Sequence, residues 1–212
     1  MDMILDHIFI LVEPGAAVAD QLIAAGLIEG SSNTHPGQGT ANRRFYFKNG
    51  MLELLYVRDA EEARHGPGSK LYFPERAGNQ DASPFGVILF AKDQPPGPVM
   101  PFPGWSYQPD YFPPPLAFHV GANATELREP LCIYAPFDTT QFKPEAPGGG
   151  RFHTLTHVNI HSPSLSETLL TASRAERLSI VPGPEHLMEI TFDSAENHRH
   201  DFRPHLPLMI HG

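Results

Sequence analysis

The chain has 212 residues, with 24 Asp and Glu against 15 Lys and Arg and a formal net charge of −9 at pH 7. This acidic balance argues against nucleic acid or an anionic membrane as the main partner. A single cysteine excludes a disulfide framework, and the apolar runs are far shorter than the ~20 residues of a membrane span. With 41% hydrophobic residues, we expect a soluble cytoplasmic protein with a sizeable core and no membrane partner.

The first quarter of the chain carries strand, helix and hairpin signals in succession. Residues 3–12 form an apolar run typical of a buried strand, and residues 15–25 carry an apolar stripe at helical spacing. Residues 34–41 hold Pro, Gly and Thr and are expected to form a loop. Two apolar runs joined by the Asn-Gly pair at 49–50 then predict a β-hairpin. Residues 1–57 are therefore predicted to form a βαβββ module.

The middle section, residues 58–150, is dominated by proline. Nine prolines fall within residues 95–115, and they exclude a central strand or a helix there because proline lacks the N–H donor that both need. We expect an extended surface segment. Additional strands are predicted at 85–91 and within 116–137, and the Pro/Gly-rich stretch 144–150 is expected to be a linker.

The last section, residues 151–212, repeats the order of the first. An amphipathic strand at 152–161 precedes a helix and three short strands, and LTHVNI at 155–160 aligns with LDHIFI near the N-terminus. His7 and His157 occupy the same place in this alignment. We therefore predict a last βαβββ module over residues 151–212, although two amphipathic strands can resemble each other without a repeat.

Three motifs resemble the glyoxalase-like domains of the vicinal oxygen chelate superfamily, which includes bleomycin-resistance proteins and dioxygenases. They are LDHI at residues 5–8, HPGQGTAN at 35–42 and MLELLYV at 51–57. The resemblance is clear over residues 3–57 and implies an α+β fold. In that fold, βαβββ modules pair their curved mixed sheets to form an open cup that holds a metal ion or a small ligand. The metal ligands of the superfamily are mostly His and Glu from the first and fourth strands of the modules.

The resemblance implies a set of metal ligands in this chain. By position, His7 and Glu53 are the first-module ligands and His157 is a ligand in the last module. The fourth-strand position there falls in LPLMI, which offers no ligand. Glu189, one predicted strand earlier, is the candidate for the fourth ligand, so the set is incomplete by strict position. The expected cofactor is a divalent ion, Zn, Ni, Mn, Co or Fe(II), which would polarise a carbonyl group. Glu53 or Glu189 could serve as the catalytic base.

Strand parity gives an argument that does not depend on the resemblance. Alternate residues of a strand share a face, so His153, His157, Asn159 and His161 lie together. Such a polar face is unusual in a plain core, because each buried polar group needs a partner. We therefore expect this face to line the cup, with Glu189 also directed inward. His153 and Asn159 are predicted ligand contacts.

The Gly-rich loop adds His35, Thr40 and Asn42 as predicted ligand contacts, because its glycines let backbone N–H groups approach a ligand. An ordinary tight loop is the alternative. The aromatic residues of the proline-rich segment either cover the mouth of the cup or anchor the segment. They are Trp105, Tyr107, Tyr111 and Phe112.

Both first-module ligands also have structural alternatives. His7 could be a core histidine bonded to a backbone carbonyl. Glu53 could pair with Arg43 or Arg44 across the hairpin.

These features predict a metal-dependent enzyme, an isomerase, lyase or dioxygenase, that acts on a small carbonyl or hydroxy-acid compound. The alternative is a metal-free protein that binds or sequesters a small molecule, as drug-sequestering members of the superfamily do in a dimeric cup. The missing fourth-strand ligand favours this alternative. In either case we expect a small-molecule partner, no nucleic acid, and the option of a homodimer.

Overall fold

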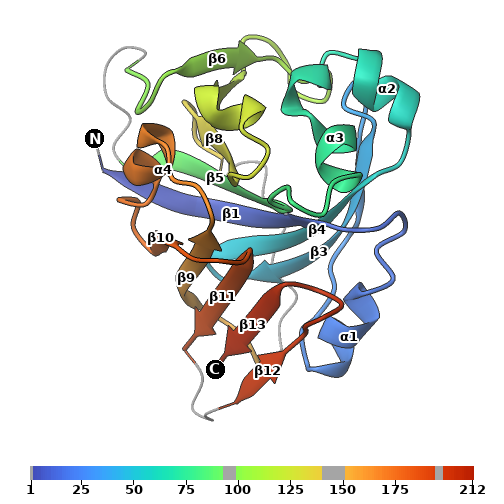
Figure 1. The fold of residues 1–212 in the computed structure, drawn as a ribbon, viewed down its shortest axis with the longest axis vertical. Coiled ribbons are helices and arrows are strands. Elements are labelled where there is room, and N and C mark those ends of the chain that lie inside the picture. Colours follow the sequence, from blue (N-terminus) through green and yellow to red (C-terminus); the bar gives the residue numbers. More distant parts are fainter. Residues whose placement is uncertain (1, 93–98, 140–150, 194–197) are drawn as a thin grey trace.

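The computed structural model describes residues 2–92, 99–139, 151–193 and 198–212, which form two β-sheets with short helices (Figure 1). The larger sheet contains β1 (Met3–Leu11), β2 (Asn33–His35), β3 (Thr40–Phe47), β4 (Gly50–Val57), β5 (Phe85–Ala91), β6 (Gly104–Tyr107), β7 (Phe118–Gly121) and β8 (Leu131–Ala135). The smaller sheet contains β9 (Leu155–Ser162), β10 (Leu178–Pro182), β11 (Leu187–Phe192), β12 (Arg199–Asp201) and β13 (Leu208–His211).

The helices are short. They are α1 (Ala19–Ala24), α2 (Ala60–His65), α3 (Phe73–Ala77) and α4 (Glu167–Ala172), with 3₁₀ turns η1 (Ser69–Leu71) and η2 (Ala122–Thr125). Within the described part of the chain, no helix is long and apolar enough to cross a membrane.

The larger sheet consists of two similarly paired halves. Its order is β2-β3-β4-β1-β5-β8-β7-β6, and β1 and β5 meet antiparallel at the centre. On either side, β1 is parallel to β4 and β5 is parallel to β8. The sheet curves into a half-barrel, so the predicted α+β fold with an open cup is confirmed. Both halves of this sheet come from one chain.

The second half of the cup differs from the sequence prediction. It is built from residues 85–135, not from residues 151–212. In the smaller sheet the order is β10-β9-β11-β13-β12, so β9 pairs with β10 and β11, whereas β1 pairs with β4 and β5. The shared strand–helix order is a local property, while strand neighbours are decided by long-range pairing.

The proline-rich segment behaves as predicted in its described part. Its one strand there, β6, falls at four residues without proline and lies at the edge of the larger sheet. The linker predicted at 144–150 lies outside the described residues.

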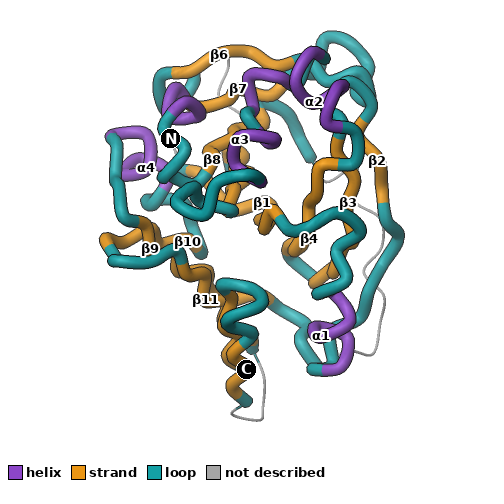
Figure 2. Tube along the Cα trace, turned by 45° about the vertical axis from the view of Figure 1, so that its right-hand side comes forward, coloured by secondary structure: helices purple, strands orange, loops and turns teal. Residues whose placement is uncertain are grey.

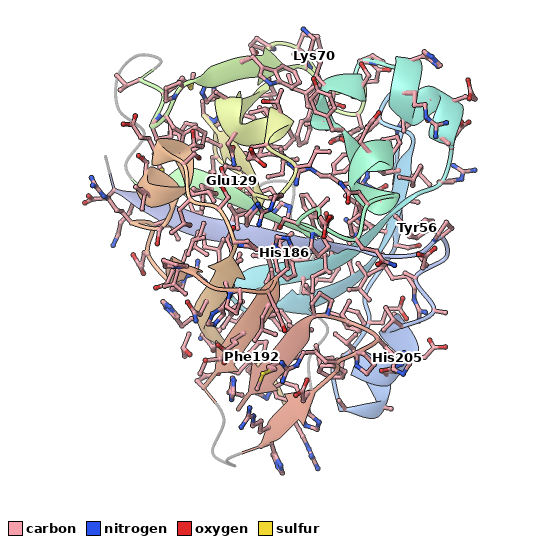
Figure 3. All side chains as sticks on the ribbon, in the orientation of Figure 1. Tyr56, Lys70, Glu129, His186, Phe192 and His205 are labelled. Atoms are coloured by element: carbon pink, nitrogen blue, oxygen red, sulfur yellow. The ribbon has the colours of Figure 1, made fainter. Side chains whose placement is uncertain are left out.

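The two faces of the larger sheet are buried by different partners. On the outer face, Ile8 and Leu52 pack with Val158, Ile190 and other apolar residues of the smaller sheet in one core cluster. On the inner face, residues of β1, β5 and β8 pack with apolar side chains of η1 and α3 in a second cluster. Figures 1 and 2 show α2 and α3 on the other side of β1 from β9 and β11. Side chains fill the space between the sheets, where Phe192 belongs to the core (Figure 3).

Two buried charged side chains, Arg76 and Glu129, form hydrogen bonds with the loops around the sheets. The Arg76 guanidinium donates to the carbonyls of Leu127 at 3.1 Å and Glu129 at 2.7 Å, and burial lowers its pKa to about 10. The Glu129 carboxylate accepts hydrogen bonds from Ser164 at 3.0 Å and Ser166 at 2.7 Å, just before α4. Both charges therefore have structural roles outside the cup.

Candidate functional site

The cup contains a cavity of about 390 Å³, within the usual size of small-molecule sites. Cross-strand register explains part of its floor, because His7, Ile88 and Ile133 are successive neighbours on β1, β5 and β8. The polar side chains around it are Asp6, His7, Asn33, His35, Gln38, Arg44, Tyr46, Lys48, Glu53, Tyr107, Tyr111 and Thr139. The main apolar ones are Phe9, Met51, Leu55, Phe73, Ile88, Phe112, Phe118 and Ile133.

The two halves of the cavity differ in chemistry. In the first half, β1 and β4 present His7 and Glu53. In the second half, the corresponding central strands β5 and β8 present Ile88 and Ile133. We call the side formed by β1 and β4, where His7 and Glu53 lie beside apolar Phe9, Met51 and Leu55, the polar wall, and the side formed by β5 and β8 the apolar wall.

Asp6 is a polar wall residue that the sequence prediction missed. A register shift in the pairing of β1 with β5 lies between Leu5 and His7, so Asp6 is an extra residue in β1. Such a bulge redirects side chains that would otherwise alternate, and both Asp6 and His7 border the cavity. His7 Nδ1 lies 2.5 Å from the Asp6 carboxylate, which also accepts from Thr139 at 2.5 Å. His7 Nδ1 therefore bonds to a carboxylate, and not to a backbone carbonyl as the structural alternative for His7 proposed.

Glu53 is the buried carboxylate of the polar wall. Its side chain is 7% exposed, and Oε1 accepts a 2.8 Å hydrogen bond from Asn42 Nδ2. Arg44 lies opposite Glu53 in register, but its guanidinium turns to the Ser31 carbonyl at 2.6 Å. Arg43 pairs with carboxylates outside the cavity. The described residues therefore show neither of the cross-hairpin ion pairs that were the alternative for Glu53.

A chain of hydrogen bonds joins the proline-rich segment to the Gly-rich loop. The hydroxyls of Tyr107 and Tyr111 donate to Gln38 Oε1 at 3.4 and 3.3 Å, and Gln38 Nε2 donates to Thr40 Oγ1 at 2.7 Å. Thr40 Oγ1 in turn lies 2.9 Å from His35 Nδ1. Burial lowers the pKa of His35 and raises the pKa of both tyrosines. These groups are therefore neutral at pH 7.

The glycines of the Gly-rich loop allow its backbone to approach α2 closely. Gly37 and Gly39 have φ of +78° and +70°, and a Cβ on Gly39 would lie 2.4 Å from the backbone nitrogen of Ala63. The Gly37 N–H donates to Glu62 at 2.7 Å. Of the predicted contacts from this loop, His35 borders the cavity. Thr40 and Asn42 are buried and hold neighbouring polar groups in place.

The other predicted site residues lie on the smaller sheet. His157, Asn159 and Glu189 share a face, as parity predicted, but that face points away from the larger sheet, since Val158 and Ile160 of β9 pack toward it. None of the three borders the cavity. The prediction that this polar face lines the cup is wrong, because the second half of the cup comes from another part of the chain.

Each of these polar groups has a local partner. The Glu189 carboxylate lies 2.8 Å from His161 Nε2 and 3.2 Å from His211 Nε2, and these hydrogen bonds lower its pKa. His157 Nε2 lies 3.0 Å from the Ser179 hydroxyl. His153 is exposed and precedes β9.

The predicted four-residue metal set is therefore split. His7 and Glu53 share the cavity, while His157 and Glu189 belong to the smaller sheet. Across the described ranges, no group of three or more His, Cys, Asp or Glu side chains is arranged to hold a metal ion.

Comparison with known proteins supports the family resemblance over the first part of the chain. Residues 5–94 match the sequence profile of the glyoxalase-like domain family. Over this range, which is less than half of the chain, the sequence is similar to a glyoxalase-like domain, and this supports the resemblance to the vicinal oxygen chelate superfamily. The matched range contains His7 and Glu53 and extends through β5. No curated protein matches the sequence.

A solved structure supports the fold of this glyoxalase-like protein over its whole length. The crystal structure of a hypothetical protein from Staphylococcus aureus has a TM-score of 0.59, covering 99% of this chain and 98% of that one. The sequence identity is 13%, so the likeness concerns the fold alone.

Proposed function

We propose that this protein binds a small organic molecule in the cup and does so without a metal centre built from four protein ligands. The division of the cavity into a polar and an apolar wall carries the proposal. A molecule with one polar end could place it against His7 and Glu53 and pack its body on Ile88 and Ile133. Sites of this kind bury most of a ligand's surface on apolar side chains and use a few polar groups to orient it.

A metal-dependent enzyme is the second candidate, and the shared position of His7 and Glu53 favours it. His7 Nδ1 is held by a carboxylate, an arrangement common in metal-binding histidines. A four-ligand centre does not fit the donor set, because the second half of the cup presents isoleucine. His7 and Glu53 could hold a divalent ion as two ligands, and such an ion would polarise a substrate oxygen. An isomerase, lyase or dioxygenase acting on a small carbonyl or hydroxy acid remains part of this candidate.

Metal content and ligand binding separate the two candidates. The protein is purified without chelators, analysed for Zn, Ni, Mn, Co and Fe, and screened for ligand-induced thermal shifts with and without EDTA. Our proposal predicts ligands whose shifts survive EDTA. Stoichiometric metal that is lost in both His7→Ala and Glu53→Ala, but kept in His157→Ala, would instead establish the second candidate.

The homodimer predicted from the resemblance remains a separate proposal. Light scattering of the purified protein tests it.

A further inference from the structure

Glu53 brings a buried charge to the cavity without a matching cation. Its carboxylate is 7% exposed, and the hydrogen bond that it accepts comes from the neutral amide of Asn42. A carboxylate withdrawn from water is costly unless a positive charge compensates it. In the described part of the chain, no Lys or Arg side chain forms an ion pair with Glu53.

The other charged groups around the cavity do not supply this cation. His7 is bonded to Asp6, so these two groups face each other. The guanidinium of Arg44 donates to the backbone carbonyls of Ser31 and Ser32, just before β2. It also lies over the ring of Tyr46. Lys48 is exposed at the surface. His35 is uncharged at neutral pH because burial lowers its pKa.

Aromatic rings surround the same space. Phe9 packs edge-on against Phe73 with ring centroids 5.8 Å apart, and Tyr111 lies 5.1 Å from Phe112. The hydroxyls of Tyr107 and Tyr111 donate to Gln38, so those protons are not directed to Glu53. The faces of aromatic rings attract cations, and their hydrocarbon surface favours apolar groups.

We infer that the ligand of the cup is a hydrophobic ammonium compound, an apolar body that carries a protonated or quaternary amine. The ammonium group would compensate the Glu53 carboxylate and contact the aromatic rings, while the body packs on Ile88 and Ile133. A carboxylate or phosphate ligand would instead meet Glu53 with a like charge. This inference rests on the proposed binding function of the cup.

Calorimetric titration of the full chain with three probes of one shape tests the inference. Phenylbutylamine, phenylbutanol and phenylbutyrate share an apolar body and differ in the charge of one end. We expect the amine to bind about tenfold more tightly than the alcohol, and the carboxylate more weakly than either. The Glu53→Gln variant keeps a side-chain oxygen that can accept the hydrogen bond from Asn42. In this variant the affinity for the amine should fall to that for the alcohol. Glu189→Gln, on the smaller sheet, should leave all three affinities unchanged.

The outcomes distinguish this inference from the proposed function. Equal affinity of amine and alcohol, tightest binding of the carboxylate, or an amine preference that survives Glu53→Gln would overturn the ammonium class and leave the binding cup intact. The comparison of the three probes in the unsubstituted protein does not depend on the folding of any variant. Failure of all three probes to bind would overturn both statements.

Discussion

Two buried carboxylates of the polar wall should respond in opposite directions to the same chemical change. Asp6 and Glu53 are 2% and 7% exposed, but Asp6 lies within hydrogen-bonding distance of His7 and Thr139, and Glu53 accepts from Asn42. Replacing each carboxylate by its amide, Asp6→Asn and Glu53→Gln, removes one charge with almost no change in shape. The sign of the stability change therefore reports whether the charge is compensated.

The magnitudes follow from the hydrogen bonds. Hydrogen bonds to a charged group contribute about 1.5–3 kcal/mol each, against about 1 kcal/mol for a neutral bond. Asp6→Asn weakens two of them, so the free energy of unfolding should fall by about 3 kcal/mol. Glu53→Gln weakens one bond by about 1 kcal/mol but removes a desolvation penalty of several kcal/mol. The net result should be a stabilisation of roughly 1–2 kcal/mol.

Urea unfolding followed by circular dichroism measures both values, and thermal unfolding gives a second reading. For a chain of this size, the Glu53→Gln midpoint should rise by roughly 2–4 °C per kcal/mol, and the Asp6→Asn midpoint should fall on the same scale. A Glu53→Gln variant destabilised by more than about 1 kcal/mol would refute the reasoning, because it would mean that a cation compensates the Glu53 carboxylate.

Three further predictions test the framework around the site. Gly86→Ala should lower the free energy of unfolding by about 1–3 kcal/mol in urea, because the added Cβ would lie 2.1 Å from the ring of Phe9; unchanged stability would contradict this close approach. Arg76→Met should cost about 3–4 kcal/mol in the same assay, since the carbonyls it binds lose their donor; a loss below about 1 kcal/mol would show that those carbonyls find other partners. The hydrogen bond with His161 lowers the pKa of Glu189, so the stability it contributes is present above its ordinary value of 4.5 and is lost as the pH falls through the lowered pKa. The melting temperature of Glu189→Gln should therefore fall less steeply than that of the unsubstituted protein as the pH drops below 4.5. An unaltered dependence of melting temperature on pH would count against a stabilising Glu189–His161 pair.

Local sequence patterns were enough to predict β1, β3 and β4. They did not predict β2, which overlaps the expected loop at 34–41, and the fold family came from the resemblance of three motifs. The Asn-Gly pair at 49–50 predicts the β3–β4 hairpin because few residue pairs accept the backbone angles of a tight turn. Prolines also exclude a central strand within residues 99–115, the described part of the proline-rich segment, since each lacks a hydrogen-bond donor. Alternation along β9 correctly placed His157, Asn159 and His161 on one face. These properties depend on residues close together in the chain.

The choice of His7 and Glu53 as site residues came from the family resemblance, and the structure places both at the cavity. His7 and Glu53 lie within one module, and their places on its strands follow from local register. His157 and Glu189 were assigned to the same site from a similarity of strand order, and the structure places them on the other sheet. Asp6 was missed because alternation sends it to the face opposite His7, and a bulge that forms only when β1 pairs with β5 reverses this.

The sequence by itself therefore determined the strands, the turns and which residues of a strand share a face, because these follow from backbone sterics and short-range alternation. The tertiary structure alone decided which strands are neighbours, and with them the composition of the cup. Pairing β1 with β5 brings apolar Ile88 beside His7 and sends the histidine-rich strand β9 to the outer sheet. Strand pairing depends on how the whole chain buries its apolar faces, which no local pattern encodes.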